Sequence, residues 1–239
     1  NGTTSAQQIN IDSDRLITAG GALSALGQQQ LQLNVRSLLD NTGGTVATNG
    51  AVRIDAGNFI NDHGTLIVAG EAASSIRVAQ QLDNSHGSMS ANGNVQLDAA
   101  NLRNHQGHIV SSQALQLQGD ELDLRQGEVS AVQVDIDAGS LDNSGGTISA
   151  TGTGQMALQV RGHLANDAGT LATNGAQHIQ AGTLSNVAGV LSSAGSSDTT
   201  IEISGRFDNT RGTVASNAGN LDLDAEHLLN ASGTISHGG

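Results

Sequence analysis

Four histidines of this chain fall close together in a repeating pattern and could bind a transition metal. His63 and His86 occupy equivalent positions in successive repeats, and His105 and His108 follow in the next one. Imidazole nitrogens suit zinc, copper and nickel. Their spacing matches no established metal signature, however, and the pattern fixes no carboxylate beside them. We therefore expect exposed histidines stacked at a turn, with no bound metal and no cofactor.

The densest group of acidic side chains could support acid–base catalysis. Enzymes that cleave acidic polysaccharides need clustered Asp with Arg or Lys on one face. No long loop is expected to build a cleft above this group, so we predict no catalytic site and no enzyme. The group consists of Asp120, Glu121, Asp123, Arg125, Asp135 and Asp137.

A column of small hydroxyl side chains could bind ice, because regular Thr arrays on a flat face can do so. His108, Glu128 and Val190 interrupt the column. The high β-propensity of Thr is by itself enough to explain Thr on a solvent-facing strand, and we expect the column to have this structural role. The column comprises Thr45, Thr65, Ser88, Thr147, Thr170, Thr213 and Thr234.

These side chains lie in or beside one repeating unit, L-x-N-x-x-G-x-[ILV], where x is any residue. The unit recurs eleven times, and its Asn position differs only at Thr18 and Leu124. Successive Asn positions are 19 to 23 residues apart. A fixed period of this length indicates a solenoid.

The Asn and Gly of the unit are assigned a structural function. We expect each Asn to point inward and to bind the backbone at a corner or the Asn one coil away. We expect each Gly to adopt a positive φ, and the coil at Leu124 to be looser because an amide is missing. The assigned residues are Asn41, Gly44, Asn61, Gly64, Asn84, Gly87, Asn104, Gly107, Asn143, Gly146, Asn166, Gly169, Asn186, Gly189, Asn209, Gly212, Asn230 and Gly233.

Between units lies a second stretch in which apolar and polar residues alternate, as in Val132-Gln-Val134-Asp-Ile136. Such alternation indicates a strand with one buried face. We expect three short sides per coil: this strand, the G-x-[ILV] strand and the L-x-N segment. The predicted fold class is all-β, a right-handed parallel β-helix of about 11 coils with roughly 20–23 residues each. Residues 1–239 are expected to form a single β-helix segment of a longer protein.

The longer coils are expected to gain their extra residues at one place, between the two strands. The added stretches are rich in Gly, Ser and Ala, so we expect them to bulge as loops along one edge of the rod. They cover residues 24–30, 68–75, 150–155 and 192–200.

The composition excludes several classes of function. The net charge is −13, with 22 acidic and nine basic residues, and there is no Cys and no Pro. An acidic chain lacks the basic face that nucleic-acid binding requires. No run of 18 apolar residues exists to insert into a membrane. The absence of Pro fits stacked strands, since Pro cannot donate to a ladder.

Units such as Leu141-Asp-Asn-Ser-Gly-Gly-Thr-Ile and Leu39-Asp-Asn-Thr-Gly-Gly-Thr-Val resemble the repeats of filamentous haemagglutinin. They are similar also to the shaft repeats of contact-dependent growth inhibition exoproteins. The resemblance extends from about Leu16 to Ile235. It implies a Gram-negative two-partner secretion exoprotein that is secreted or held at the bacterial cell surface, with roles in adhesion and virulence. Its implied partners are an outer-membrane transporter and a receptor on a host or target cell.

Three functions are therefore considered. The leading expectation is a monomeric, non-enzymatic shaft segment that displays distal binding or toxin regions away from the cell. The alternative is an adhesive binding module that contacts host glycan or protein through its loop edge. The third is a polysaccharide-active β-helix enzyme.

Overall fold

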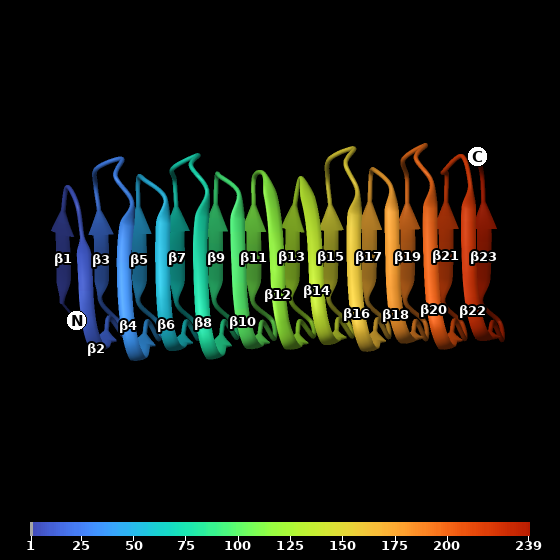
Figure 1. Ribbon diagram of the computed structural model, residues 1–239, viewed down its shortest axis with the longest axis horizontal. Helices are drawn as coiled ribbons and strands as arrows, with labels where there is room; N and C mark the ends of the chain where they lie inside the picture. Colours follow the sequence, from blue (N-terminus) through green and yellow to red (C-terminus); the bar gives the residue numbers. More distant parts are fainter. Residues whose placement is uncertain (1) are drawn as a thin grey trace.

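The chain winds into a right-handed parallel β-helix in which each coil contributes one short and one long strand (Figure 1). The computed structural model describes residues 2–239. All helix or strand elements among these residues are strands, and every pairing between them is parallel. The predicted fold class, a parallel β-helix of about 11 coils, is confirmed.

Each short strand has four residues, and from β3 onwards it begins directly after the consensus Gly. The alternation of small outward and apolar inward residues suits a strand with one buried face. The short strands are β1 (Thr3–Ala6), β3 (Ala22–Ala25), β5 (Thr45–Thr48), β7 (Thr65–Val68), β9 (Ser88–Ala91), β11 (His108–Ser111), β13 (Glu128–Ala131), β15 (Thr147–Ala150), β17 (Thr170–Thr173), β19 (Val190–Ser193), β21 (Thr213–Ser216) and β23 (Thr234–His237).

The long strands have eight to ten residues and contain the alternating stretch together with the consensus Leu or Phe. They are β2 (Asn10–Ile17), β4 (Leu31–Asp40), β6 (Val52–Ile60), β8 (Ser74–Asp83), β10 (Val95–Arg103), β12 (Ala114–Asp123), β14 (Gln133–Asp142), β16 (Met156–Ala165), β18 (Gln177–Ser185), β20 (Thr199–Asp208) and β22 (Leu221–Leu229).

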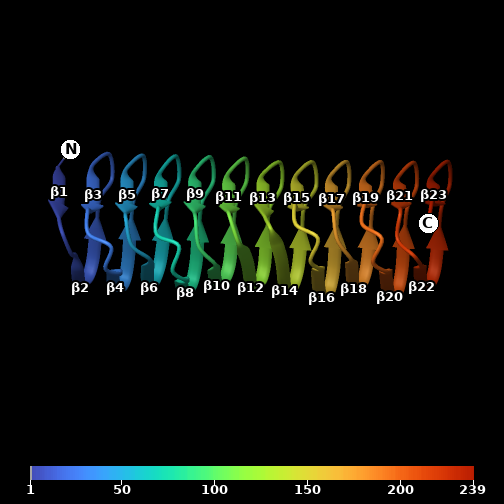
Figure 2. The same cartoon turned by 90° about the horizontal axis from the view of Figure 1, so that it is seen from above.

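The strands form two continuous sheets that run the length of the rod (Figure 2). Every strand pairs with its equivalent in the next coil, so Val46 lies between Leu23 and Leu66. The prediction of a third separate side is wrong. Leu39 and Asp40 complete the long strand β4, and Asn41 begins the turn that follows.

Pairing between long strands is interrupted near their middle. Val35 of β4 faces Ala56 of β6, but Leu38 faces Asn58, so β4 carries one extra residue there. Such a β-bulge bends a strand locally. The prediction that coil length varies at one place is therefore wrong. A 23-residue coil has three residues more than a 20-residue coil such as that of β5 and β6. Two of them lie in the loop between the strands and one lies in the long strand.

Five-residue loops follow β3, β7, β15 and β19. They rise above the shorter loops along the same edge of the rod, at the top of Figure 1. The predicted loop ridge along one edge is thus confirmed. Connections of different length can be accommodated there because they lie outside both sheets.

The core is a thin column of aliphatic layers between the sheets. The consensus Leu or Phe is buried in the inner coils, as at Leu39, Phe59 and Leu82, each 0% exposed. The apolar residue after the consensus Gly packs opposite, as at Val46, which is also 0% exposed. Burying such a side chain contributes about 1.5–3 kcal/mol, so the regular spacing of these residues drives the stacking of the coils.

Candidate functional site

The asparagines of the repeat form a buried ladder of side-chain hydrogen bonds along the rod. The Nδ2 of Asn41 donates to the Oδ1 of Asn61 at 2.7 Å, and Asn61 donates to Asn84 at 2.7 Å. The same bond, at 2.6–2.7 Å, joins the later neighbouring asparagines on either side of Leu124. Most of these Asn side chains are fully buried. The expectation that the amides point inward and bind one another is confirmed.

Each ladder amide from Asn41 to Asn209 also closes its own turn. Its Nδ2 lies 3.0–3.4 Å from the carbonyl oxygen of the consensus Gly in the same coil. At the N-terminal end, the Oγ1 of Thr18 donates to the Oδ1 of Asn41 at 2.8 Å. Thr18 therefore caps the ladder, because a hydroxyl can donate as an amide does.

Leu124 interrupts the ladder without loosening the coil. The Oδ1 of Asn143 is buried and accepts no hydrogen bond from residues 2–239. The backbone N–H of Leu124 still donates to Asp142 at 2.8 Å, and that of Gln126 to Ser144 at 3.0 Å. These distances match those in other coils. The prediction of a looser coil is therefore wrong, since the loss is confined to the side-chain ladder.

The consensus glycine has a different role from the one predicted. Positive φ belongs to the preceding residue, as at Gly43 (58°) and His63 (53°), and to none of the eleven consensus glycines. A Cβ on Gly64 would lie 2.3 Å from the carbonyl oxygen of Asn41 and 2.6 Å from the Oδ1 of Asn61. The glycine is therefore required by the close approach of the preceding coil. The prediction of a positive φ at this residue is wrong.

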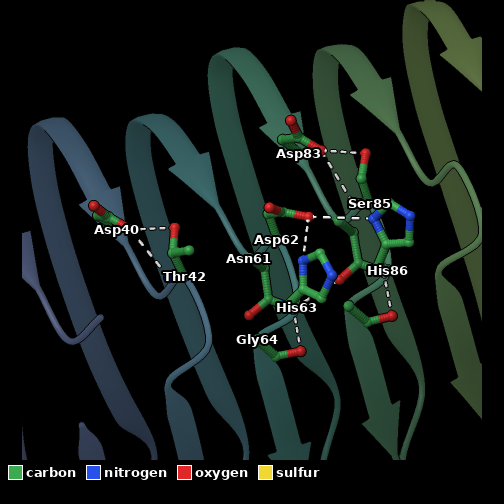
Figure 3. Close-up of polar contacts among 11 residues, drawn as sticks. Asp40, Thr42, Asn61, Asp62, His63, Gly64, Asp83, Ser85 and His86 are labelled. Atoms are coloured by element: carbon green, nitrogen blue, oxygen red, sulfur yellow. Dashed lines mark hydrogen bonds and ion pairs between the residues drawn. The ribbon is translucent and has the colours of Figure 1, made fainter. Parts of the chain in front are cut away.

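An additional column of aspartates stabilises the same turns. The Oδ1 of Asp40 accepts a hydrogen bond from the N–H of Thr42 at 3.0 Å, which makes an Asx turn over the intervening Asn (Figure 3). Sequence reasoning missed this column, although Asp directly before the consensus Asn signals it. Equivalent bonds are made by Asp83, Asp123, Asp142 and Asp208.

Two of these turn carboxylates have lowered pKa values. Burial raises the pKa of Asp123, but hydrogen bonds from the side chain and N–H of Arg125 and its charge outweigh this and lower it. For Asp208, the hydroxyl of Thr210 lowers the pKa most; burial opposes this, and the N–H of Thr210 and the Arg206 side chain lower it further. Both aspartates are thus held as anions in the turn.

The structure separates the acidic side chains singled out as a catalytic candidate. Asp135 and Asp137 lie on the first half of β14, where they face Gln116 and Gln118 of β12. Asp123 ends β12 and binds Arg125, with an Nη2–Oδ2 distance of 2.7 Å. Asp137 binds Arg161 at 2.7 Å. Asp123 and Asp137 are thus each paired with an arginine, at different places along the strands.

The histidines lie together on the turn edge. The rings of His63 and His86 stack with centroids 4.6 Å apart, and His105 lies 6.2 Å from His86. The expectation that no carboxylate lies beside them is wrong. The Oδ1 of Asp62 is 2.9 Å from the Nδ1 of His63 and 3.5 Å from that of His86 (Figure 3). His108 is paired separately with Glu128 at 3.0 Å.

The predicted Thr column forms one edge of the short-strand sheet. Thr45, Thr65 and Ser88 are direct partners in neighbouring strands, and His108 continues the column. These positions are half-buried or exposed. The array is regular, but the larger His108, Glu128 and Val190 side chains prevent a continuous face of hydroxyl groups.

The pattern of the haemagglutinin repeat family matches residues 1–31, 25–86, 72–155, 154–211 and 208–239. These matches together extend over the whole chain. The chain belongs to the haemagglutinin repeat family. No curated protein and no solved structure matches it.

Haemagglutinin repeats are structural and adhesin repeats rather than an enzyme family. The surface of these repeats carries a groove of about 780 Å³ along β2 to β12. Two of its carboxylates, Asp12 and Asp55, are paired with Arg36 and Arg53 at 3.1 and 2.8 Å. Within residues 2–239, no helix is long and apolar enough to cross a membrane. The features that recur along the rod are the parallel strand pairs and the Asn ladder, and both are contacts between neighbouring coils.

Proposed function

We propose that this chain is a non-catalytic shaft segment of a secreted filamentous adhesin or a contact-dependent inhibition exoprotein. Its role is mechanical, because it holds a distal binding or toxin region away from the producing cell. The observation that carries the proposal is the continuity of the contacts between coils. Both sheets, and the Asn ladder on each side of Leu124, follow the rod from coil to coil.

Contacts in the rod are made between nearest neighbours. Strands in a sheet lie about 4.8 Å apart, so each additional coil lengthens the rod by about that amount. In a solenoid the stability is approximately a sum of the coils and the interfaces between them. The sequence can therefore vary at loops and outward positions while length and stiffness are maintained.

The coil surface supports a passive role. The exposed ion pairs between coils, such as Arg36–Asp12 and Arg161–Asp137, join side chains that are more than 45% exposed. Such pairs contribute about 0–1 kcal/mol each. The net charge of −13 favours solubility of a long exposed rod. The proposed partners are the outer-membrane transporter that secretes the parent protein and a receptor contacted by its distal region.

A cell-binding assay with the isolated chain tests this function. The chain is labelled at an added C-terminal tag, and its size is checked by light scattering, where we expect a monomer. A shaft segment should not bind host or bacterial cells above the level of an unrelated acidic protein. Saturable binding would contradict the proposal and favour the adhesive module.

The loop ridge allows the alternative to be located. If binding is found, the five-residue loops at residues 26–30, 69–73, 151–155 and 194–198 are each replaced by a three-residue loop such as Asn174-Gly175-Ala176. Loss of binding on replacement would assign adhesion to the loop edge. Turnover of an acidic polysaccharide by the unmodified chain would instead support the enzyme.

A further inference from the structure

We propose that Asp62, His63 and His86 form a binding site for a divalent transition metal, with zinc as the expected ion. The three side chains come from two adjacent coils and meet at the turn edge (Figure 3). Each offers one ligand atom, and these atoms lie within 4.8 Å of one another. This site goes beyond the proposed shaft function and does not depend on it.

The distances suit a tetrahedral ion. Zinc binds His nitrogen at about 2.0–2.1 Å and carboxylate oxygen at about 2.0–2.2 Å, so its tetrahedral ligands are about 3.3 Å apart. The Oδ1 of Asp62 is 2.9 Å from the Nδ1 of His63 and 3.5 Å from the Nδ1 of His86. Both distances lie close to the tetrahedral edge. The rings of His63 and His86 stack at 19° to each other, so both exposed rings must turn out of the stack to direct their nitrogens at one ion.

The backbone positions these ligands before any ion binds. His63 and His86 have φ values of 53° and 54°, so their side chains leave equivalent turns in the same direction. The N–H of His63 donates to Ser85 at 3.0 Å, and the N–H of His86 donates to His105 at 3.0 Å. The carbonyl oxygen of Asp62 accepts from Gly43 at 3.0 Å. Backbone bonds between coils therefore fix the spacing of the ligands.

The hydrogen bonds of Asp62 distinguish this turn from the other turns of the rod. Turn aspartates such as Asp83 precede the consensus Asn and bind the backbone of their own turn. Asp62 follows its Asn, and the hydrogen bonds of its carboxylate go to the two histidines. Two neutral imidazoles and one carboxylate leave a divalent ion with a net charge of +1, which suits an acidic chain. The fourth coordination position faces solvent, since the side chains of His63 and His86 are 64% and 43% exposed.

Isothermal titration of the whole chain with zinc sulfate tests the site. We expect one zinc ion per chain. His86→Ala and Asp62→Asn should each weaken binding at least tenfold, since loss of a supporting partner alone costs 10–100-fold. The matched control is His108→Ala, because His108 forms a similar His–carboxylate pair with Glu128 but has no second histidine at the carboxylate. That variant should bind zinc as the unmodified chain does.

Circular dichroism of each variant checks that the coils remain folded. Cobalt provides an independent readout, since a tetrahedral cobalt complex absorbs strongly in the visible range. The band should appear with the unmodified chain and His108→Ala and be absent with His86→Ala. No heat with zinc at millimolar concentration would overturn the proposal. Equal affinity in the unmodified chain and in His86→Ala would overturn it as well.

Discussion

Leu124 lies one coil before Asn143, in the position from which an asparagine would donate a hydrogen bond to the Oδ1 of Asn143. That buried oxygen accepts no hydrogen bond within residues 2–239. In the other inner coils the same oxygen accepts a bond of 2.6–2.7 Å from the coil before. The ladder is thus divided into two runs, Thr18 to Asn104 and Asn143 to Asn230.

Leu124→Asn should join the two runs at little cost to stability. The substitution removes a fully buried aliphatic side chain, a loss of about 1.5–3 kcal/mol. It supplies two hydrogen bonds of about 1 kcal/mol each and relieves an unsatisfied acceptor that costs about 1–3 kcal/mol. The gains equal or exceed the loss, so we expect the urea midpoint to be unchanged or raised.

The matched control is Asn166→Leu in an intact run. It removes the donor to the Oδ1 of Asn186, which is 2.7 Å away. The Oδ1 of Asn186 is then buried without a hydrogen-bond donor. This should lower the free energy of unfolding by about 1–3 kcal/mol beyond any strain from the larger side chain. If Leu124→Asn destabilises as much as Asn166→Leu, the ladder does not carry the stability assigned to it.

The repeat made the fold predictable, but the turn geometry was only partly so. The spacing of Leu39, Asn41, Gly44 and Val46 was enough to predict a parallel β-helix with inward amides. A constant Gly can be required by positive φ or by close approach, and sequence alone does not distinguish the two. The His cluster was visible, but pairing of Asp62 with His86 depends on side-chain directions at a positive-φ turn. The one-residue bulge in β4 was hidden because its extra residue kept the alternation of apolar positions.

Adjacent glycines allow the role of the consensus glycine to be tested. Gly43 has a φ of 58°, and a Cβ there would enter open space, whereas a Cβ on Gly44 would lie 2.4 Å from the carbonyl oxygen of Thr18. Ala168 and Ala188 already occupy the position equivalent to Gly43. We expect Gly43→Ala to cost about 1 kcal/mol. Gly44→Ala should cost more, because it must push two coils apart. Thermal unfolding of both variants would contradict this account if Gly43→Ala were the more harmful.

The turn aspartates predict loss of stability in acid. The pKa of Asp208 is lowered in the folded chain, so the unfolded chain takes up this proton at higher pH. Its contribution is complete above about pH 4, the ordinary Asp value, and is lost as the pH falls through the folded pKa. Asp208→Asn keeps an acceptor for the N–H of Thr210 but cannot titrate. Urea midpoints at pH 7 and pH 3 should therefore differ less in this variant than in the unmodified chain. Equal differences would argue against a stabilising role for the anion.

The loop edge should tolerate insertions that the turn edge does not. Four Gly/Ser residues placed between Thr153 and Gly154 nearly double a five-residue loop, at a cost of about 0.6 kcal/mol. The same insertion between Asn166 and Asp167 separates the ladder amide from the turn that it closes at Gly169. We expect the first variant to express and unfold like the parent and the second to be strongly destabilised. A similar loss of stability in both variants would show that the loop edge tolerates insertions no better than the turn edge.

The central claim, that the chain is a rod built from interchangeable coils, is tested most directly by deleting two of them. Removing residues 144–186 joins Asn143 to Val187, so the sequence Asn-Val-Ala-Gly keeps the consensus spacing. Asn143 can then donate to Asn209 as Asn186 does at 2.7 Å. Small-angle X-ray scattering should show a folded rod shortened by about 10 Å, two strand spacings. Collapse of the rod, or a folded particle of unchanged length, would contradict the account.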